Sequence, residues 1–328
     1  FGAKFFDGAN RLSIHNHLYP SANTGIAWLR GRPEVIRAHQ GFLGGVMRVD
    51  LFGVREGGTI DGKVTAPLRP HVPELQPGKT YLLETVIRTL KMGHLFTEGT
   101  SDSNQVWLDV TAKIGDRVIG RSGGMAKDGE VDPWSHFVNA FVLDRHGNRI
   151  DRRNAEDIFI PLYNNQIPPG AGAVVHYRLD VPADATGHVQ FDVSLKFRKF
   201  DTRYMRYFQG EAFAGNDLPI MTLAQDSVVF PLDEATARSI GPDRLEGAHF
   251  PPDWERWNDY GIGLLLKAGR SHKGELRQAE AAFKEVERLG RPEGPVNLAR
   301  VYEREGRLAE AVAALERAAA FDPPAPPW

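Results

Sequence analysis

The sequence predicts a mainly β fold with α-helices at its end: an antiparallel β-sandwich followed by a short α-helical array. Between about residues 46 and 235, short apolar or alternating runs are separated by turn residues, which is typical of a two-sheet sandwich. After residue 253 the alternation gives way to apolar residues that recur about every 3.6 positions, which indicates helices. The 328 residues also exceed one ordinary hydrophobic core, so more than one domain is expected.

Four segments are expected along the chain. An irregular N-terminal segment covers 1–45, the β-sandwich domain covers 46–235, a linker covers 236–252, and a helical domain covers 253–328. The first segment is rich in Asn, Gly, Pro and Ser, which supply turns, and a short helix can begin at Pro33. The linker contains Gly and Pro residues that interrupt regular structure.

The expected strands alternate between an apolar and a polar face. In chain order they are VMRVDLFGV, KTYLLETVIRTL, QVWLDV, RVIG, HFVNAFVLD, DIFIPLY, VVHYRLDVP, VQFDVSLKFRKF and IMTLAQDSVVFPL. In QVWLDV the residues Val106, Leu108 and Val110 share one face, and Trp107 lies on the other. In VQFDVSLKFRKF the apolar face is formed by Phe191, Val193, Leu195 and Phe197.

Composition excludes several classes of function. The formal net charge of -2 and the pI of about 6.6 do not suit a nucleic-acid binder, which neutralises many phosphates. No apolar run approaches the roughly 20 residues that span a bilayer, so no membrane span is expected in this chain. The absence of cysteine excludes disulfides, thiolate zinc sites, a cysteine nucleophile and covalent attachment of c-type haem within the chain.

The search for catalytic motifs favours a non-enzymatic protein. The sequence contains no G-x-S-x-G, no H-E-x-x-H, and no phosphate- or dinucleotide-binding glycine loop after a strand. A carbohydrate-active sandwich with two acidic residues in a cleft is the remaining enzymatic alternative. The segment RKFDTRYMRYF interleaves basic and aromatic residues, but the overall charge favours a sandwich strand that runs into a basic surface loop.

Three histidines are candidate ligands. His15 and His17 are two positions apart, so they can share one face of an extended segment and ligate a metal or haem iron. His94 lies between two glycines, close to Met92, in a segment that can fold back on itself. On spacing alone, ordinary hydrogen-bonded loop histidines are the favoured interpretation of all three.

The C-terminal helices match a repeat pattern. The segment PVNLARVYEREGRLAEAVAALERAAAFDPP fits the tetratricopeptide pattern of two antiparallel helices, with a turn at Gly306. A looser copy precedes it, so a tetratricopeptide-like α-helical array is expected. Such arrays present a concave face to protein partners, and the predicted partner-binding residues are Trp257, Tyr260 and Tyr302. The alternative is a plain packing appendage on the sandwich. The pattern residues of the last repeat are Leu298, Ala299 and Tyr302 in its first helix and Ala311, Leu315 and Ala318 in its second.

An ordered series of motifs resembles a known family. MGHLFTEGTSDSNQVWLDV resembles the G-H-x-x-P-T-G-T-x-D-S-N-x-x-W-L-x-V segment in the C-terminal region of periplasmic multihaem c-type cytochromes with tetratricopeptide repeats. HNHLYPSANTGIAWLRG resembles their N-H-x-F-P-G-A-N-T-A-L-P-x-L-R-G segment. Five further segments agree with the family in the same order along the chain: MRVDLFGVR, NNQIPPGAGAVVHYRLDVP, LKFRKFDTRYMRYF, NDLPIMTLAQDSVVFPL and WERWNDYGIGLLLKAG. The resemblance therefore covers most of the chain from about residue 13.

This resemblance implies a haem context. In that family a haem-bearing segment precedes this region, and a histidine of either motif can serve as a distal axial ligand. His17 and His94 thereby become candidate haem ligands, on condition that another segment or chain supplies haem c, because this chain has no cysteine. Thr97-Glu98 and Tyr19-Pro20-Ser21 depart from the Pro-Thr and Phe-Pro-Gly of the family motifs.

The resemblance therefore implies a periplasmic, haem-free accessory or scaffold subunit of an electron-transfer assembly, respiratory or photosynthetic. It would dock through the β-sandwich and the helical repeats on protein partners, a cytochrome or another redox complex. The alternative is the C-terminal part of a multihaem cytochrome c that supplies distal histidine ligands for electron transfer.

Overall fold

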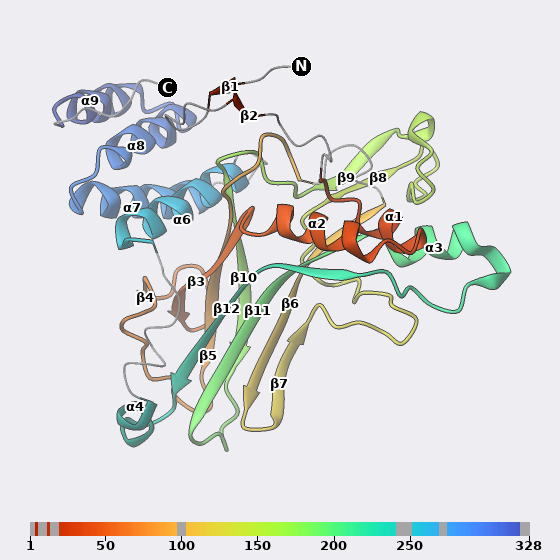
Figure 1. The fold of residues 1–328 in the computed structure, drawn as a ribbon. Helices are drawn as coiled ribbons and strands as arrows, with labels where there is room; N and C mark the ends of the chain where they lie inside the picture. The colour runs from red at the N-terminus through yellow and green to blue at the C-terminus, as the bar shows by residue number, and fades with distance from the viewer. Residues whose placement is uncertain are drawn as a thin grey trace.

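The computed structural model describes residues 20–96, 103–240, 251–268 and 274–321, together with the backbone of the short strands β1 (Lys4–Phe5) and β2 (Leu12–Ser13). Most strands form two four-stranded antiparallel sheets; the C-terminal helix α6 packs against one of them, and α7 to α9 stack onward from α6 (Figure 1). The predicted fold class, antiparallel β followed by a helical array, is confirmed. No helix within the described ranges is both long and apolar enough to cross a membrane.

The first sheet has the order β10-β5-β3-β4. Its strands are β3 (Met47–Glu56), β4 (Val64–Thr65), β5 (Thr80–Thr89) and β10 (Gly172–Asp180). A register shift between Leu51 and Gly53 exchanges the two faces of β3, so that Val54 joins the inner face and Arg55 the outer face.

The second sheet has the order β12-β11-β6-β7. Its strands are β6 (Asn104–Ile114), β7 (Arg117–Ser122), β11 (His188–Lys199) and β12 (Ile220–Pro231). A separate antiparallel hairpin of β8 (Ala140–Leu143) and β9 (Ile160–Asn164) lies beside this sheet, near helix α3 (Figure 1).

The inner faces of the two sheets share one hydrophobic core, which makes the fold a β-sandwich. The predicted apolar faces of β6 and β11 are confirmed, because the residues assigned to them are all buried in this core: Val106, Leu108, Val110, Phe191, Val193, Leu195 and Phe197. Trp107, expected on the outward face, is also buried, since the segment after β7 covers it and Gly123 accepts its indole hydrogen bond at 3.2 Å.

In the part of the chain that the structure describes, four shorter helices flank the sheets: α1 (Thr24–Leu29), α2 (Pro33–Leu43), α3 (Thr202–Gln209) and α4 (Glu234–Ile240). The helix expected at Pro33 is therefore present. Residues 202–209, expected as a surface loop, form α3 because the Asp201 carboxylate caps it and accepts from the Tyr204 amide at 2.8 Å. α4 occupies the start of the expected linker.

The C-terminal helices are α6 (Asp253–Ala268), α7 (Gly274–Arg288), α8 (Glu293–Arg304) and α9 (Leu308–Ala319). Each helix packs against its neighbours in sequence, as expected of a helical array. Leu315, placed by the repeat pattern among the inward residues, is exposed instead, and Ala311, Ala314 and Ala318 are buried. α9 is the last helix that the structure describes, and within the described residues no further helix covers its outer face.

Close packing of α7 and α8 requires glycine at position 294. A Cβ atom there would lie 2.7 Å from Cα of Glu287 and 2.8 Å from the carbonyl oxygen of Phe283, which is too close for backbone atoms of a neighbouring helix. Gly41 on α2 is exposed and has no atom within 4 Å of such a Cβ.

We expect Gly294→Ala to lower the free energy of unfolding by about 1–3 kcal/mol, because α7 and α8 must separate. Gly41→Ala is the matched control, and it should leave stability unchanged or raise it by up to about 1 kcal/mol, because alanine favours a helix. Urea unfolding followed by circular dichroism measures both. Equal stabilities for the two variants would show that the helices do not approach as closely as described.

Candidate functional site

Helix α6 covers the outer face of the first sheet. Phe52 on β3 lies between two rings of α6: it stacks on Tyr260 with centroids 4.5 Å apart and meets Trp257 edge-on at 4.8 Å. Val86 on β5 and Val174 on β10 complete the apolar part of this contact. The strands β3 and β5 are therefore buried on both faces, against the second sheet on one side and α6 on the other.

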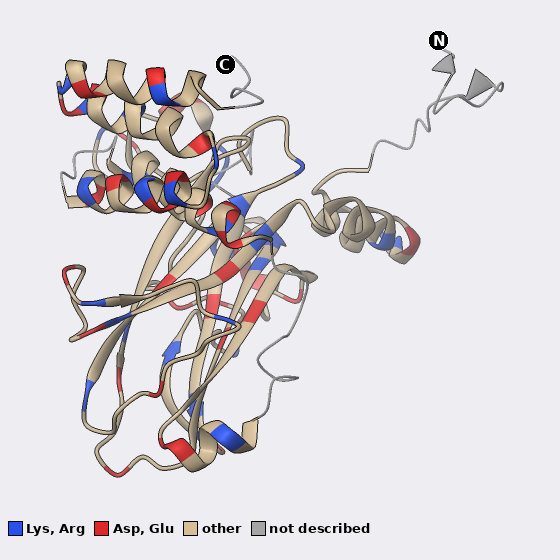
Figure 2. Ribbon diagram, turned by 90° about the vertical axis from the view of Figure 1, so that its left-hand side faces the viewer, with Lys and Arg blue, Asp and Glu red and all other residues tan. Residues whose placement is uncertain are grey.

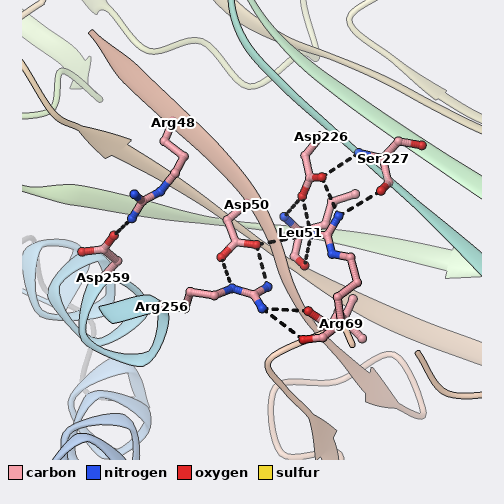
Figure 3. A network of polar contacts seen from close by, with 9 residues as sticks. Arg48, Asp50, Leu51, Arg69, Asp226, Ser227, Arg256 and Asp259 are labelled. Carbon is pink, nitrogen blue, oxygen red and sulfur yellow. Dashed lines mark hydrogen bonds and ion pairs between the residues drawn. The ribbon is translucent and has the colours of Figure 1, made fainter. Parts of the chain in front are cut away.

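Buried ion pairs surround the apolar contact (Figure 3). Arg256 of α6 donates from Nε and Nη2 to the two carboxylate oxygens of Asp50 on β3, both at 2.8 Å. Its Nη1 donates to the carbonyl oxygen of Leu68 at 2.8 Å. Arg256 and Asp50 are 1% and 4% exposed, so water screens this pair little.

A second buried pair joins the two sheets beside the first. Arg69 donates to both carboxylate oxygens of Asp226 on β12, at 2.6 and 2.7 Å, and it also lies 3.5 Å from Asp50. The Asp226 carboxylate accepts in addition from the Leu51 amide at 2.7 Å (Figure 3). One chain of contacts therefore runs from β12 through β3 to α6.

A third buried carboxylate, that of Asp259 on α6, neutralises two arginines that face each other in the sheet. Arg48 on β3 and Arg88 on β5 are directly opposite each other in the sheet, where like charges repel. Asp259 contacts both, with the Arg88 pair at 2.7 Å, and Glu255 lies 3.1 Å from Arg48. Burial raises the pKa of the Asp259 carboxyl, and the two arginines offset part of this rise.

Glu84 is the centre of a further buried cluster under α6. Its carboxylate contacts Arg55, whose Nη2 donates to the Tyr260 hydroxyl at 3.1 Å, and lies 2.7 Å from Nε2 of His176. Burial alone would raise the pKa of the Glu84 carboxyl, but His176 and Arg55 outweigh it and lower the pKa below its usual value. The carboxylate is therefore ionised at neutral pH.

These contacts position helix α6 on the first sheet. Each carboxylate is held by arginine or histidine in bidentate or multiple contacts, so neither a free nucleophile nor a free base is presented there. Among the described residues, no three His, Asp or Glu side chains gather where they could hold a metal ion. Figure 2 shows residues of both charges along the helices and on the strand segments beneath them.

The structure describes one of the two predicted haem ligands, His94. His17 lies outside the described residues, and its assignment stays a prediction. His94 follows β5 and is exposed, with Nδ1 2.9 Å from the carbonyl oxygen of Leu95. When Nδ1 carries the proton and donates to that oxygen, Nε2 is in the form that binds metal ions.

The three predicted partner-binding rings lie against the chain's own residues. Tyr260 is 1% exposed between Phe52 and the Arg55 cluster, and Tyr302 is buried under Arg307, with its hydroxyl donating to Glu280 at 3.3 Å. Trp257 is half-buried against Phe52. Tyr260 thus joins helix to sheet, a role that the repeat pattern did not indicate, and partner binding by these rings stays a prediction.

A group of large apolar side chains is exposed on α3 and around β9 instead. Each is between 45 and 64% exposed, and the group, here called the aromatic lobe, consists of Ile158, Phe159, Ile160, Leu162, Tyr207 and Phe208. Arg152, in the segment between β8 and β9, places its guanidinium 5.0 Å from the centre of the Tyr207 ring on α3. Arg145 lies similarly over Phe159, at 5.7 Å.

The aromatic lobe has the composition of a protein-binding surface. Contiguous exposed apolar patches are rare on monomeric proteins and mark interaction sites. Aromatic residues and arginine are also the types enriched at the centres of interfaces. The segment that carries α3 drew attention in the sequence through its basic and aromatic residues, whereas the β9 residues were assigned to a sandwich strand.

Comparisons with known proteins add little. No model of a protein family matches the chain, and no curated protein matches it. Among solved structures, a penta-haem cytochrome c552 from Thermochromatium tepidum is 15% identical with a TM-score of 0.37 over 58% of this chain, which covers 41% of that cytochrome chain. The likeness is of the kind that the sequence motifs imply, but at this TM-score it carries no argument for fold or function.

A double-mutant cycle tests the ion pair between sheet and helix. Arg256→Met and Asp50→Leu should each lower the free energy of unfolding by about 3–5 kcal/mol, because each leaves a buried charge without its main partner. The double variant should lose less than the sum of the two, by at least about 2 kcal/mol, because it leaves neither charge behind.

Arg117→Met is the matched control, since its 3.0 Å pair with Asp184 is exposed, and it should cost no more than about 1 kcal/mol. Urea unfolding of the two single variants, the double variant and the control gives the four free-energy changes. Additive losses for Asp50 and Arg256 would contradict the described pair.

Proposed function

We propose that this chain is a non-enzymatic accessory subunit of a periplasmic electron-transfer assembly, and that it docks on a haem protein through the aromatic lobe. The exposed aromatic lobe is the observation that carries the docking part of the proposal. The ordered motifs that resemble multihaem cytochromes support the choice of a redox partner. The chain itself contains no cysteine, so any haem c is attached to another segment or chain.

The geometry of the lobe supports binding of a protein rather than a small ligand. Its side chains project from a helix and a hairpin, so they present a surface and not a pocket. Arg145 and Arg152 are held over aromatic rings, so their guanidinium groups are ordered near the apolar patch. An apolar docking face with carboxylates at its rim is the chemistry that fits this surface.

The rest of the chain supports a scaffold role. The buried pairs of Arg256 with Asp50 and of Asp259 with Arg48 and Arg88 join helix α6 to the first sheet, and Arg55 adds a hydrogen bond to Tyr260. A firmly oriented array can hold a second protein at a defined position relative to the lobe. The outer face of α9, with Leu308, Val312 and Leu315 exposed, is the surface that the array offers for this.

The alternative function is a haem-ligating module, and the Nδ1 contact of His94 is the observation that favours it. The Leu95 carbonyl oxygen at 2.9 Å selects the tautomer in which Nε2 can ligate iron. In that case His94 would be an axial ligand to a haem carried by a neighbouring segment or chain.

Gentle purification of the tagged full chain from its native host tests the docking proposal. We expect a Soret absorption band in the size-exclusion peak that contains the chain, with a haem protein identified by mass spectrometry of the same peak. Phe159→Ser and Phe208→Ser should each weaken this association by about 2 kcal/mol or more, because each removes an aromatic anchor from the interface.

Val118→Ser, an exposed position on β7, is the matched control and should retain the partner. A colourless peak that holds the chain alone would contradict the proposal, as would loss of the partner from the control as well. His94→Ala separates the two functions: under docking alone the haem spectrum stays unchanged, and under axial ligation its bands shift.

A further inference from the structure

A cavity of about 180 Å³ lies where α6 meets β10 and the segment that precedes it. Its apolar part is formed by Ala173 and Val174 of β10 and by Leu266 of α6. Gly263 of α6 also lines it, and a Cβ there would lie 2.9 Å from Cγ2 of Val174. The absence of a side chain at Gly263 lets α6 approach β10 closely, and the cavity lies where these two elements meet.

His136 supplies a polar group without a partner. Its ring lines the cavity, and its Nε2 atom is buried and forms no hydrogen bond with any described residue. The His136 carbonyl oxygen accepts from the Leu108 amide at 3.0 Å, so the backbone is fixed beside β6. A buried polar atom without a partner is costly, and a bound group that hydrogen-bonds to it would remove this cost.

Lys267 supplies a positive charge at the same cavity. It lies 3.6 Å from Glu275, and its side chain is 38% exposed, so the ammonium group is only loosely paired. Burial, assisted by the charge of Lys267, lowers the pKa of His136 to about 4. At neutral pH the cavity thus offers one cation and one neutral imidazole.

The dimensions restrict the ligand to a small molecule. An engineered apolar cavity of about 150 Å³ accommodates benzene, so this cavity accommodates a molecule of about six non-hydrogen atoms. The lining combines Ala173, Val174, Gly263 and Leu266 with the polar side chains of His136, Asn165, Gln166 and Lys267. Lys267 is the one cation among these residues, so a singly charged anion with a short apolar body fits better than a phosphate dianion.

We propose that the cavity binds a short aliphatic monocarboxylate, with its carboxylate between Lys267 and His136 and its chain against Val174 and Leu266. The His136 ring lines the cavity but its Nε2 atom is buried, so binding turns the ring about its broad χ2 torsion to bring Nε2–H to a carboxylate oxygen. The Lys267 ammonium donates a charge-assisted hydrogen bond to the carboxylate from the side opposite His136. This site is separate from the aromatic lobe and does not depend on the proposed docking function.

Isothermal titration calorimetry of the full chain with sodium butyrate at pH 7 tests the proposal. We expect saturable one-to-one binding of butyrate and weaker binding of acetate, because acetate buries less chain. 1-Butanol, which has the same chain without the carboxylate, should bind at least about tenfold more weakly than butyrate.

Variants of the two polar residues locate the site. Lys267→Met and His136→Phe should each weaken butyrate binding by about tenfold or more, with the folded state checked by urea unfolding. Lys284→Met is the matched control: this lysine is also ion-paired on the helical array, with Glu280 at 2.7 Å, but does not line the cavity. Absence of saturable butyrate binding would overturn the proposal, as would equal losses in Lys284→Met or equal affinity for 1-butanol.

Discussion

The contact between helix α6 and the outer face of the first sheet is the constraint on which the rest of the structure depends. Arg256 can be buried only because Asp50 on β3 receives both ends of its guanidinium group, and Asp50 can be buried only because Arg256 covers it. Such pairs contribute little net stability compared with apolar residues, but they accept one geometry. The position of the helical array follows from this geometry, and the cavity lined by His136 lies at the same junction.

The sequence predicts the fold well wherever the spacing of apolar residues matches the side chains that the fold buries. The alternating residues of β6 and β11 face the core as expected, and the period of about 3.6 after residue 253 corresponds to four helices. The errors occur where another segment changes the environment of a residue. Trp107 is buried by a distant segment, and Leu315 is exposed because no described helix covers it. Residues 202–209 form a helix because one aspartate caps them.

The candidate sites were less predictable, because they depend on contacts between distant segments. Asp50 and Glu84 interrupt apolar strand sequences, and a charge in such a run is a signal that a buried partner exists. The sequence does not show that these partners are Arg256 and Arg55: the first follows from the packing of α6 on β3, and the second from the register of β3 with β5. The aromatic lobe likewise joins α3 to β9, whose residues are about 40 positions apart.

Native-state hydrogen exchange of α6 and β3 tests the central claim most directly. If the buried ion pairs unite helix and sheet, the slowest amides of both, such as those of Leu264 and Leu51, exchange only through global unfolding and report the same free energy. Exchange of the α6 amides at a clearly lower free energy, while β3 stays protected, would contradict it. The helical array would then open independently of the sandwich.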